Sequence, residues 1–347
     1  MSTLEKLVEW FLHSPIYENG AYLAYYSSRG RGPIYPEITA YAISLSCILC
    51  KRRKKEEFLE RAERCADYMI KINKNGAVPS FSDNLLYAFD TGIFISSMFD
   101  LYTLTEKEIY LKEAEKSINW LYSLWSDKNF SAVSSVPENR EWYHVPSVHL
   151  VKLAIPLIKA SIHLEDHRHE IAALELLEKY RRLQEENGSF KVSEVSDVVM
   201  AHPHCYATEG FLYAYHAFKR LEYLEAARKS SDWLTKTQNQ DGSFYRCYDL
   251  ERTPGHMRIE EKLKTSDATA QATRIWKLLG VNQEGIDKAY EYLNTELKDN
   301  GLRLFKKSSL RGTLLSGQRP VYSWPTFFYL HSLILAFGDA ESWGELF

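Results

Sequence analysis

Cysteine is scarce in this chain of 347 residues, and long hydrophobic runs are missing. The five cysteines are an odd number spread widely along the chain, which fits reduced thiols better than a disulfide framework. No apolar stretch approaches the roughly 20 residues that a transmembrane helix needs. Residues 1–6 lead directly into an amphipathic segment without the apolar region of a signal peptide. The sequence therefore predicts a cytoplasmic protein without a membrane span.

An excess of basic charge is also missing. The chain carries 43 lysines and arginines against 46 aspartates and glutamates, a net charge of -3, which argues against nucleic acid as a partner. The basic run at residues 51–55 falls between two helical segments, where a solvated turn explains it. No linker rich in proline or serine interrupts the chain, so we expect a single domain over residues 1–347.

A short turn recurs along the whole chain. Its central residues are Gly20, Gly76, Phe130, Gly188, Gly242 and Gly301, at steps of 56, 54, 58, 54 and 59 residues. Periods in this range are typical of a supersecondary unit that buries its apolar face only by stacking on copies of itself. Each turn follows an amphipathic segment and precedes a more apolar one, so the repeat predicts six helical hairpins closed into a ring, an all-α fold with short β-ribbons in its loops.

The two helices of each hairpin differ in composition. The amphipathic set has charged faces and is expected on the outside, at residues 3–13, 56–73, 106–125, 169–184, 221–238 and 284–297. The second set is nearly free of charge beyond its first turns, and a helix that is apolar on all sides is buried. These inner helices are expected to begin near Tyr35, Tyr87, Tyr143, His202, Ser266 and Tyr322.

Polar and aromatic residues gather where the inner helices begin. Because every turn precedes an inner helix, regular hairpins would place all six helix starts at one end of the ring. Aromatic rings stack on the apolar faces of sugar rings, and carboxylates and imidazoles bond to hydroxyl groups. The residues at these starts include Tyr35, Glu37, Asp90, Trp142, His144, His202, His204, Tyr206, Asp267, Tyr322 and Trp324. This combination predicts a sugar-binding site.

The carboxylates at these starts also have a structural explanation. Asp90 and Asp267 can cap free N–H groups, and Glu37 follows a proline in a first turn, where a carboxylate complements the helix dipole. Glu209 differs, because it lies inside the buried segment 206–218 and there needs a partner or a chemical purpose. Burial raises the pKa of a carboxylic acid, so the position of Glu209 favours a proton-donating role.

Histidines flank a proline at the fourth inner helix. Imidazoles titrate near neutral pH, so His202 and His204 suit general acid or base catalysis, and His144 and His149 occupy the matching stretch of the preceding hairpin. A metal site made of His202, His204 and Glu209 is an alternative. Alternate residues at a helix start do not reliably share a face, however, and we predict no metal and no cofactor.

The alternation of inner and outer helices resembles the (α/α)6 toroid of six-hairpin carbohydrate-active proteins, and the resemblance covers the whole chain. Segments 35–41, 204–210 and 266–272 are similar to segments of glycosyl-hydrolase-like proteins from polysaccharide and archaeal glycosylation clusters. The superfamily includes inverting glycosidases, unsaturated-uronyl hydrolases, uronate lyases and sugar epimerases. The resemblance therefore implies a carbohydrate substrate more firmly than one reaction.

Two members of this superfamily imply specific residue roles. Uronyl hydrolases use an Asp on each of two neighbouring inner helices, and Asp90 could match one, although the next inner helix, at residues 145–149, supplies no Asp. Acylglucosamine epimerases place catalytic histidines on later inner helices. His204 could match one of these, but the last inner helix offers Tyr322 and Trp324 where the second is expected.

We predict a glycoside hydrolase that binds an acidic sugar or oligosaccharide, with Glu209 as the acid and Asp90 or Asp267 as the base. Glu37 and His204 are further catalytic candidates. Predicted substrate-binding residues are Tyr35, Arg140, Trp142, His144, His202, Tyr206, Arg319, Tyr322 and Trp324, with Arg140 or Arg319 pairing with a uronate carboxylate.

Three alternatives stay open. The same fold could serve a uronate lyase or a sugar epimerase, or a glycan-binding protein without catalysis. Segment 238–244 resembles the Gln/Gly/aromatic repeat of terpenoid cyclases and protein prenyltransferases, although the cyclase Asp-x-Asp-Asp motif is absent from the sequence.

Overall fold

The structure is a computed structural model that describes residues 1–81, 85–135, 142–194, 196–249, 263–307 and 319–347. Helices dominate, and short strands lie in the connections between them. The chain forms two compact units. Unit 1 comprises Met1–Ile16, Ala24–Gly32 and Leu183–Leu346, and unit 2 comprises Tyr17–Leu23, Pro33–Arg182 and Phe347. The single domain expected over residues 1–347 stays a prediction.

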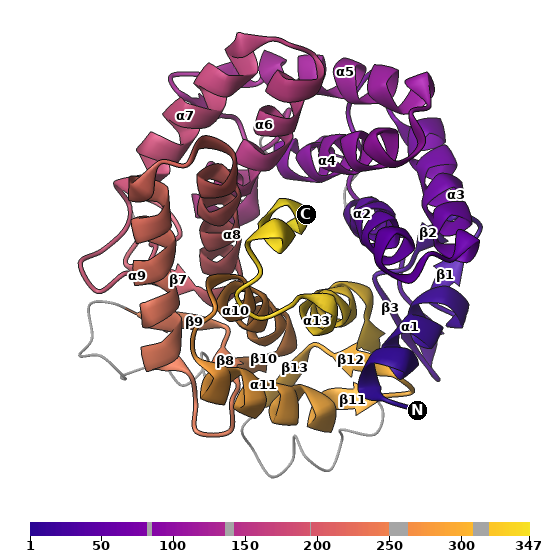
Figure 1. Ribbon diagram of the computed structural model, residues 1–347, viewed down its shortest axis with the longest axis vertical. Helices are drawn as coiled ribbons and strands as arrows, with labels where there is room; N and C mark the ends of the chain where they lie inside the picture. The colour runs from indigo at the N-terminus through magenta and orange to yellow at the C-terminus, as the bar shows by residue number, and fades with distance from the viewer. Residues whose placement is uncertain (82–84, 136–141, 195, 250–262, 308–318) are drawn as a thin grey trace. The chain divides into compact units, whose positions relative to one another are not determined.

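Unit 2 consists of alternating buried and amphipathic helices (Figure 1). The buried, inner helices are α2 (Pro36–Arg53), α4 (Ala88–Thr105) and α6 (Ala154–His163), and the outer ones are α3 (Glu56–Ile72), α5 (Glu108–Ser123) and α7 (His167–Arg181). Helix α2 buries every residue from Pro36 to Leu49, whereas α3 buries only the stripe that includes Phe58, Cys65 and Met69. The two layers follow from the composition of the helices, as expected.

The third inner helix begins later than predicted. Its expected start near Tyr143 carries only the short 3-10 helix η1 (Trp142–His144), and a second 3-10 helix, η2 (Val148–Leu153), leads into α6. Pro156 explains the late start, because a proline ring clashes with the carbonyl four residues earlier and is tolerated only in the first turn of an α-helix. Pro156 is the third residue of α6, so the α-helix cannot extend back to Tyr143.

Unit 1 repeats the same alternation. Its inner helices are α8 (Ala201–Phe218), α10 (Ser266–Leu279) and α13 (Ser323–Ile334), and its outer helices are α1 (Thr3–His13), α9 (Leu221–Thr237) and α11 (Gln283–Glu296). Helix α1 packs against α13 through Phe11, whose ring centre lies 5.2 Å from that of Phe327. The 3-10 helix η5 (Ala340–Glu345) contacts α8 and α10. All five cysteines of the chain are free thiols, as predicted.

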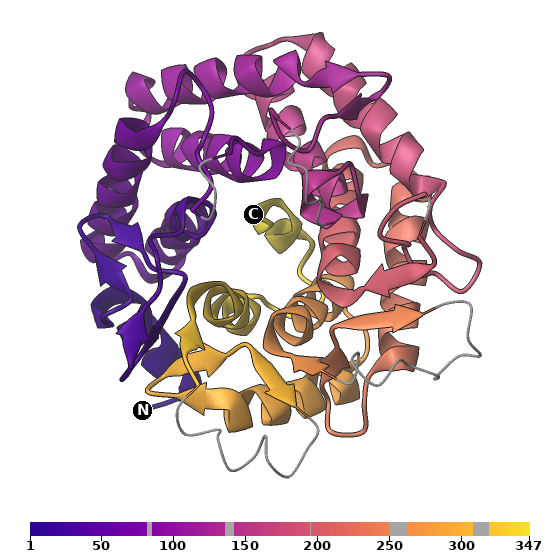
Figure 2. The same ribbon diagram turned by 180° about the vertical axis from the view of Figure 1, so that it is seen from behind.

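Short strands precede the inner helices of unit 1, and Figure 2 views them from the side on which they lie. One sheet has the order β11-β12-β14-β3-β4, a second has the order β13-β10-β8, and β7 pairs with β9. Unit 2 holds the ribbons β1-β2 and β5-β6. The strand bounds are β1 Tyr17–Glu18, β2 Ala21–Tyr22, β3 Tyr25–Ser27, β4 Gly30–Arg31, β5 Trp125–Ser126, β6 Asn129–Phe130, β7 Val198–Met200, β8 Phe244–Tyr245, β9 Cys247–Asp249, β10 Leu263–Thr265, β11 Leu297–Lys298, β12 Gly301–Arg303, β13 Phe305–Lys307 and β14 Val321–Tyr322.

The recurring turn needs glycine for two reasons. Gly76 has φ 102°, a left-handed conformation, and a Cβ atom there would lie 2.7 Å from the carbonyl oxygen of Lys116 on the next outer helix. Phe130 does not adopt a positive φ; at that turn Asp127 and Lys128 do. At the last turn the left-handed residues are Asp299 and Asn300.

Gly301 does not hold the left-handed position at the last turn. Its φ is not positive, and its role is steric, because a Cβ atom would lie 2.8 Å from the Trp10 ring.

Glutamine side chains stabilise two of the other turns by hydrogen bonds. Gln184 donates to the carbonyls of Gly188 and Ala226, and Gln238 donates to those of Gly242 and Gly285. The Gln/Gly pattern at 238–244 is thus explained by the turn itself.

A second repeated contact ties five of the six turns to an inner helix. The backbone N–H two residues after the left-handed position donates to the side chain of the fourth residue of the helix. That fourth residue is Thr39 on α2, Thr91 on α4, His204 on α8, Thr269 on α10 and Thr326 on α13. His204 therefore occupies a position that threonine fills in the other four helices.

In the part of the chain that the structure describes, no helix combines the length and the apolar character needed to cross a bilayer.

Candidate functional site

Three inner helices of unit 1 bring matching side chains together. On α8, α10 and α13 the second, sixth and ninth residues lie on one face, because they are four and three positions apart. We call these nine residues the contact cluster: His202, Tyr206 and Glu209 on α8, Asp267, Gln271 and Arg274 on α10, and Trp324, Phe328 and His331 on α13.

The second residues form the rim of the contact cluster. The indole Nε1 of Trp324 donates to Oδ2 of Asp267 at 3.3 Å, and Nδ1 of His202 lies 3.9 Å from the same oxygen. The other carboxylate oxygen of Asp267 accepts from the Thr265 hydroxyl and, at 2.7 Å, from the Ala268 N–H. The carboxylate is thus held in one orientation beside an imidazole and an indole, at a helix N-terminus that favours negative charge.

The ninth residues form the floor of the contact cluster. Glu209 accepts a hydrogen bond from Nη2 of Arg274, and neither residue is exposed to solvent. The guanidinium also lies 4.5 Å from the centre of the Phe328 ring and contacts Nδ1 of His331 at 3.3 Å. A guanidinium only donates, so this histidine nitrogen is an acceptor.

The sixth residues join the rim to the floor. Gln271 contacts His202 with its Oε1, 2.5 Å from Nδ1, and donates to Glu209 with its Nε2 at 3.5 Å. The Tyr206 ring lies 4.3 Å from the His202 ring and is buried. The first turns of α8, α10 and α13 contact one another, and so do their third turns. Helices α8, α10 and α13 therefore run parallel, as the hairpin repeat predicts for inner helices within this unit.

Exposure falls from the rim to the floor. The His202 side chain is 22% exposed and that of Asp267 9%, and Trp324 is half-buried. Gln271, Glu209 and Arg274 are fully buried. A ligand could therefore reach the imidazole, the carboxylate and the indole, but not the ion pair beneath them. This arrangement supplies an aromatic surface, a carboxylate that accepts hydrogen bonds and an imidazole.

His204 faces away from the contact cluster. Its Nδ1 accepts from the Phe190 N–H at 3.1 Å, and its Nε2 lies 2.8 Å from the Ser230 hydroxyl on outer helix α9. Burial lowers the pKa of His204 to about 3, so the ring is neutral at physiological pH. These contacts make His204 a structural residue, and we leave it out of the catalytic residues proposed below.

The same contacts argue against the metal site considered from the sequence. His202 contacts α10 and α13, whereas His204 contacts α9. Residues two positions apart project about 200° from each other on a helix, so His202, His204 and Glu209 do not converge. Within the described ranges, no group of three or more His, Cys, Asp or Glu residues is placed to hold a metal ion.

Several predicted residues belong to unit 2. Glu37, the second residue of α2, is buried and accepts from the Tyr35 hydroxyl at 2.6 Å. Asp90, the third residue of α4, is buried, and the buried His144 ring stacks on Tyr87 at 5.9 Å. The expected approach of Glu37 and Asp90 to Glu209 and Asp267 stays a prediction.

The remaining predicted substrate-binding residues are distributed as follows. Tyr322 immediately precedes α13, and its ring lies 5.0 Å from that of Trp324, close to the rim. Arg319 donates from Nη1 to the Phe305 carbonyl at 2.7 Å. Arg140 lies outside the described residues, as does the side chain of Trp142.

Gln271, Arg274, Phe328 and His331 were not predicted as site residues. A signal for them exists in the sequence: each follows a predicted rim residue by four or seven positions on the same inner helix. Applying the helical period to Asp267 and Trp324 would have found all four.

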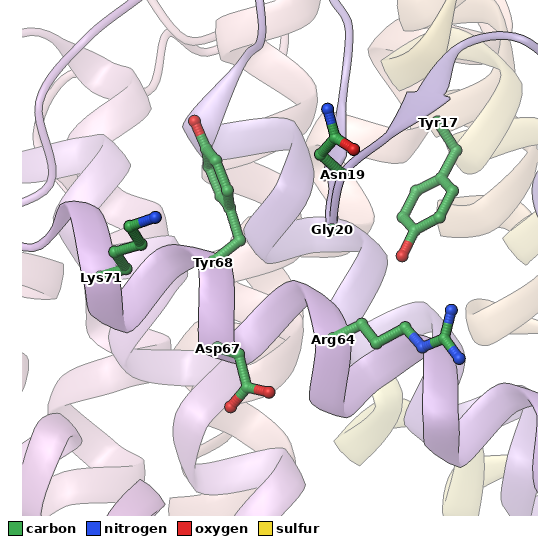
Figure 3. Close-up of a pocket in the computed structure, with 7 residues that line it drawn as sticks. All are labelled: Tyr17, Asn19, Gly20, Arg64, Asp67, Tyr68 and Lys71. Atoms are coloured by element: carbon green, nitrogen blue, oxygen red, sulfur yellow. The ribbon is translucent and has the colours of Figure 1, made fainter.

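A separate cleft lies on the outer side of unit 2 (Figure 3). It has a volume of about 490 Å³ and lies between the β1-β2 turn and α3. Its lining residues are Tyr17, Asn19, Gly20, Arg64, Asp67, Tyr68 and Lys71. None of these was predicted from the inner-helix starts. Gly20 closes one side, because its backbone packs directly against the Arg64 carbonyl.

Comparison with known proteins gives matches by structure. No protein-family model and no curated protein matches the chain by sequence. The cellobiose 2-epimerase of Bacillus thermoamylovorans B4167 is similar in structure, with a TM-score of 0.74 and 11% identity over 94% of this chain and 97% of the epimerase. The chain has the (α/α)6 toroid fold.

Two further toroid proteins are similar over most of their length. They are the unsaturated glucuronyl hydrolase of Bacillus sp. GL1, with a TM-score of 0.67 and 13% identity over 96% of this chain and 93% of the hydrolase, and the GH76A α-1,6-mannanase of Salegentibacter sp. HEL1_6, with a TM-score of 0.64 and 11% identity over 94% of this chain and 96% of the mannanase. At these identities the likeness establishes the toroid architecture, as the resemblance of the sequence implied.

Proposed function

We propose that this toroid protein is a carbohydrate-active enzyme that binds a sugar or oligosaccharide at the rim of the contact cluster and acts on it by acid–base catalysis. The observation that carries the proposal is the contact of the buried Asp267 carboxylate with the partly exposed side chains of Trp324 and His202. An indole face suits a sugar ring, and the carboxylate and imidazole suit its hydroxyl groups. Enzymes named for action on sugars or glycans share the fold, which supports the same substrate class.

Glycoside hydrolysis is the first reaction we propose. Asp267 is the proposed base, because its position in the first turn of α10 favours the ionised form. Asp90 and Glu37, each buried in the first turn of an inner helix of unit 2, stay predicted catalytic residues. An inverting hydrolase needs its two carboxyl groups about 6.5 to 9.5 Å apart.

Glu209 has a different role in this proposal from the one expected from the sequence. A general acid must carry a proton and reach the substrate. Glu209 is fully buried and paired with Arg274, a cation that favours the ionised carboxylate. We therefore propose that Glu209 helps to position the rim residues and does not donate a proton to the substrate.

The acidic-sugar substrate remains part of the proposal. A uronate carboxylate would pair with the guanidinium of Arg319, because a planar guanidinium can donate two parallel N–H bonds to a carboxylate. Tyr322 and Trp324 would form the aromatic surface beside it.

Proton transfer at a sugar carbon, as in an epimerase or a lyase, is a second candidate reaction. The observation that favours it is the position of His202, an imidazole at the exposed rim that is held by Gln271. An imidazole can take a proton from a carbon next to a carbonyl group, which begins both epimerisation and elimination and which hydrolysis by two carboxylates does not require. Epimerisation is completed when a proton is delivered to the opposite face of that carbon, and elimination when the leaving group departs.

The test is incubation with neutral and uronate-containing oligosaccharides in ¹⁸O-water and in D₂O. Hydrolysis places ¹⁸O at a new reducing end, epimerisation places deuterium on a sugar carbon, and a lyase forms an unsaturated product without incorporating water. Asp267→Asn should lower hydrolytic turnover roughly 10²-fold or more. The control is Asp232→Asn, which changes an exposed carboxylate on outer helix α9.

Two results would contradict the proposal. Equal turnover by Asp267→Asn and Asp232→Asn would remove Asp267 from the reaction. Tight binding of glycans without any turnover would instead favour the glycan-binding protein considered from the sequence.

A further inference from the structure

We propose that a buried relay from Arg274 through Glu209 and Gln271 fixes the tautomer of His202, so that Nδ1 carries the proton and Nε2 is the basic nitrogen of the ring. From the sequence His202 was predicted as a substrate-binding residue of a type that suits acid–base catalysis. The relay makes it a proton-transfer residue and makes Gln271 and Glu209 positioning residues. The tautomer follows from the contacts themselves, whereas the catalytic use of Nε2 rests on the proposed function.

The first step of the relay is the ion pair. Glu209 and Arg274 lie on neighbouring inner helices, and both are fully buried. The guanidinium only donates hydrogen bonds, and beside it the carboxylate stays ionised and only accepts. The Phe328 ring packs against the guanidinium at 4.5 Å and helps to hold its plane. The position of the carboxylate is therefore set from α10.

The second step is the orientation of the Gln271 amide. The two ends of this amide face different partners, Glu209 on one side and His202 on the other. Because an ionised carboxylate cannot donate, the amide nitrogen must be the end that faces Glu209, at 3.5 Å. The reverse orientation would place the amide oxygen against a negative oxygen. The ion pair thus turns the amide oxygen toward His202.

The third step is the histidine tautomer. Gln271 Oε1 lies 2.5 Å from Nδ1 of His202 and can only accept, so Nδ1 must carry the hydrogen. The nearby carboxylate oxygen of Asp267, 3.9 Å from the same nitrogen, is a second acceptor and favours the same assignment. In the neutral ring the lone pair therefore resides on Nε2.

This assignment defines what His202 can do. Nε2 can accept a proton from a hydroxyl group of the bound sugar or from a water molecule, while the electron pair stays on the oxygen. The positive charge then formed on the ring is stabilised at Nδ1 by the Gln271 oxygen and by Asp267. Return of the proton from Nε2 restores the neutral ring, so no other reactant is needed.

The test is ¹H–¹⁵N NMR of the histidine side chains in the full chain without ligand. The His202 resonances are assigned by their loss in His202→Asn. We expect the wild type to show the Nδ1–H tautomer at neutral pH. In Gln271→Met, which has a similar size but no amide oxygen, the Nδ1–H form should lose its majority. Gln283→Met on outer helix α11, where the amide contacts Asp287, is the matched control and should leave His202 unchanged.

The outcomes separate this inference from the proposed function. An Nε2–H tautomer in the wild type, or an unchanged tautomer in Gln271→Met, would overturn the relay; the wild-type spectrum alone decides if the variant fails to fold. Once a substrate is known, the kcat of Gln271→Met should be roughly tenfold or more below that of Gln283→Met, and the KM should change little. If the expected tautomers are observed but no sugar is turned over, the proposed function is contradicted and the relay is supported.

Discussion

Glu209 on α8 and Arg274 on α10 form an ion pair from which solvent is fully excluded. Each charge has lost its hydration, and the pair is kept by mutual attraction and by contacts with Gln271, His331 and Phe328. A buried pair of this kind is a weak source of net stability, but removal of one partner leaves the other charge buried and uncompensated. The pair thus ties two inner helices together directly beneath the proposed site.

Glu209→Gln should destabilise unit 1. The substitution leaves the Arg274 guanidinium buried without its counter-charge, so we expect a loss of about 3 to 5 kcal/mol in the free energy of unfolding, measured by denaturant titration. Replacement of both residues by apolar side chains of similar volume, Glu209→Leu with Arg274→Met, should recover much of this loss.

The control for this prediction is Glu284→Gln, which breaks the exposed pair with Lys288 on outer helix α11. It should change the unfolding midpoint very little, because exposed ion pairs are well solvated in both states. If Glu209→Gln were as mild as Glu284→Gln, the pair would not be the support that we infer.

His204→Thr should reduce the acid sensitivity of the protein. The pKa of His204 is lowered by burial to about 3, against an ordinary value near 6.5. Between these values the unfolded chain binds a proton that the folded chain does not. Stability is therefore fully present above about pH 6.5 and falls by roughly 1.4 kcal/mol per pH unit below it. Threonine cannot titrate there, so the variant lacks this contribution.

The measurement is urea unfolding of both proteins from about pH 7 to about pH 4, with the difference between them plotted against pH. Histidines present in both proteins, such as His169, cancel in this difference. Threonine is the natural replacement because Thr39, Thr91, Thr269 and Thr326 accept the equivalent backbone N–H bond. Parallel pH curves for the two proteins would contradict the assignment of His204 as a buried, neutral ring.

Gly76→Ala should be clearly destabilising, whereas Gly30→Ala should not. Gly76 has φ 102°, and a Cβ atom there would lie 2.7 Å from the Lys116 carbonyl and 2.9 Å from Cβ of Trp120. The left-handed conformation alone costs a non-glycine residue roughly 1 to 2 kcal/mol. No atom lies within 4 Å of the corresponding position at Gly30. The melting temperature of Gly76→Ala should be lower than that of Gly30→Ala. Equal melting temperatures would show that the turn accommodates a Cβ atom without strain.

The hairpin architecture could be predicted from the sequence because its signals are local. Glycine turns at a constant period and a change from amphipathic to apolar helices mark each repeat. The late start of α6 could have been predicted too, since Pro156 is visible in the sequence. The shift at the last turn could not, because Asn300 takes the left-handed position and the need for Gly301 comes from Trp10, a contact between distant parts of the chain.

The candidate site was predicted less completely. Asp267, His202 and Trp324 were identified because polar and aromatic residues stand out at the start of apolar helices. His204 stood out equally, and only its tertiary contacts show that it serves the turn instead. The helical period places Arg274 on the same face as Asp267, but its pairing with Glu209 could not be predicted, because it depends on how α8 and α10 pack.

The two roles of Trp324 can be separated by substitution. Its ring is the proposed surface for a sugar, and its Nε1 donates to Asp267 at 3.3 Å. Trp324→Ala removes both, so we expect the Kd for a bound oligosaccharide to rise roughly tenfold or more, the equivalent of about 1.4 kcal/mol. Trp324→Phe keeps an aromatic face without the N–H group, so it should bind within a few-fold of wild type but turn over more slowly, because Asp267 loses a donor that orients it. Titration calorimetry measures the Kd and steady-state kinetics measure the turnover, so the two methods together distinguish these effects. Unaltered binding by Trp324→Ala would mean that the sugar does not contact this ring, and full activity in Trp324→Phe would mean that the hydrogen bond to Asp267 has no catalytic consequence.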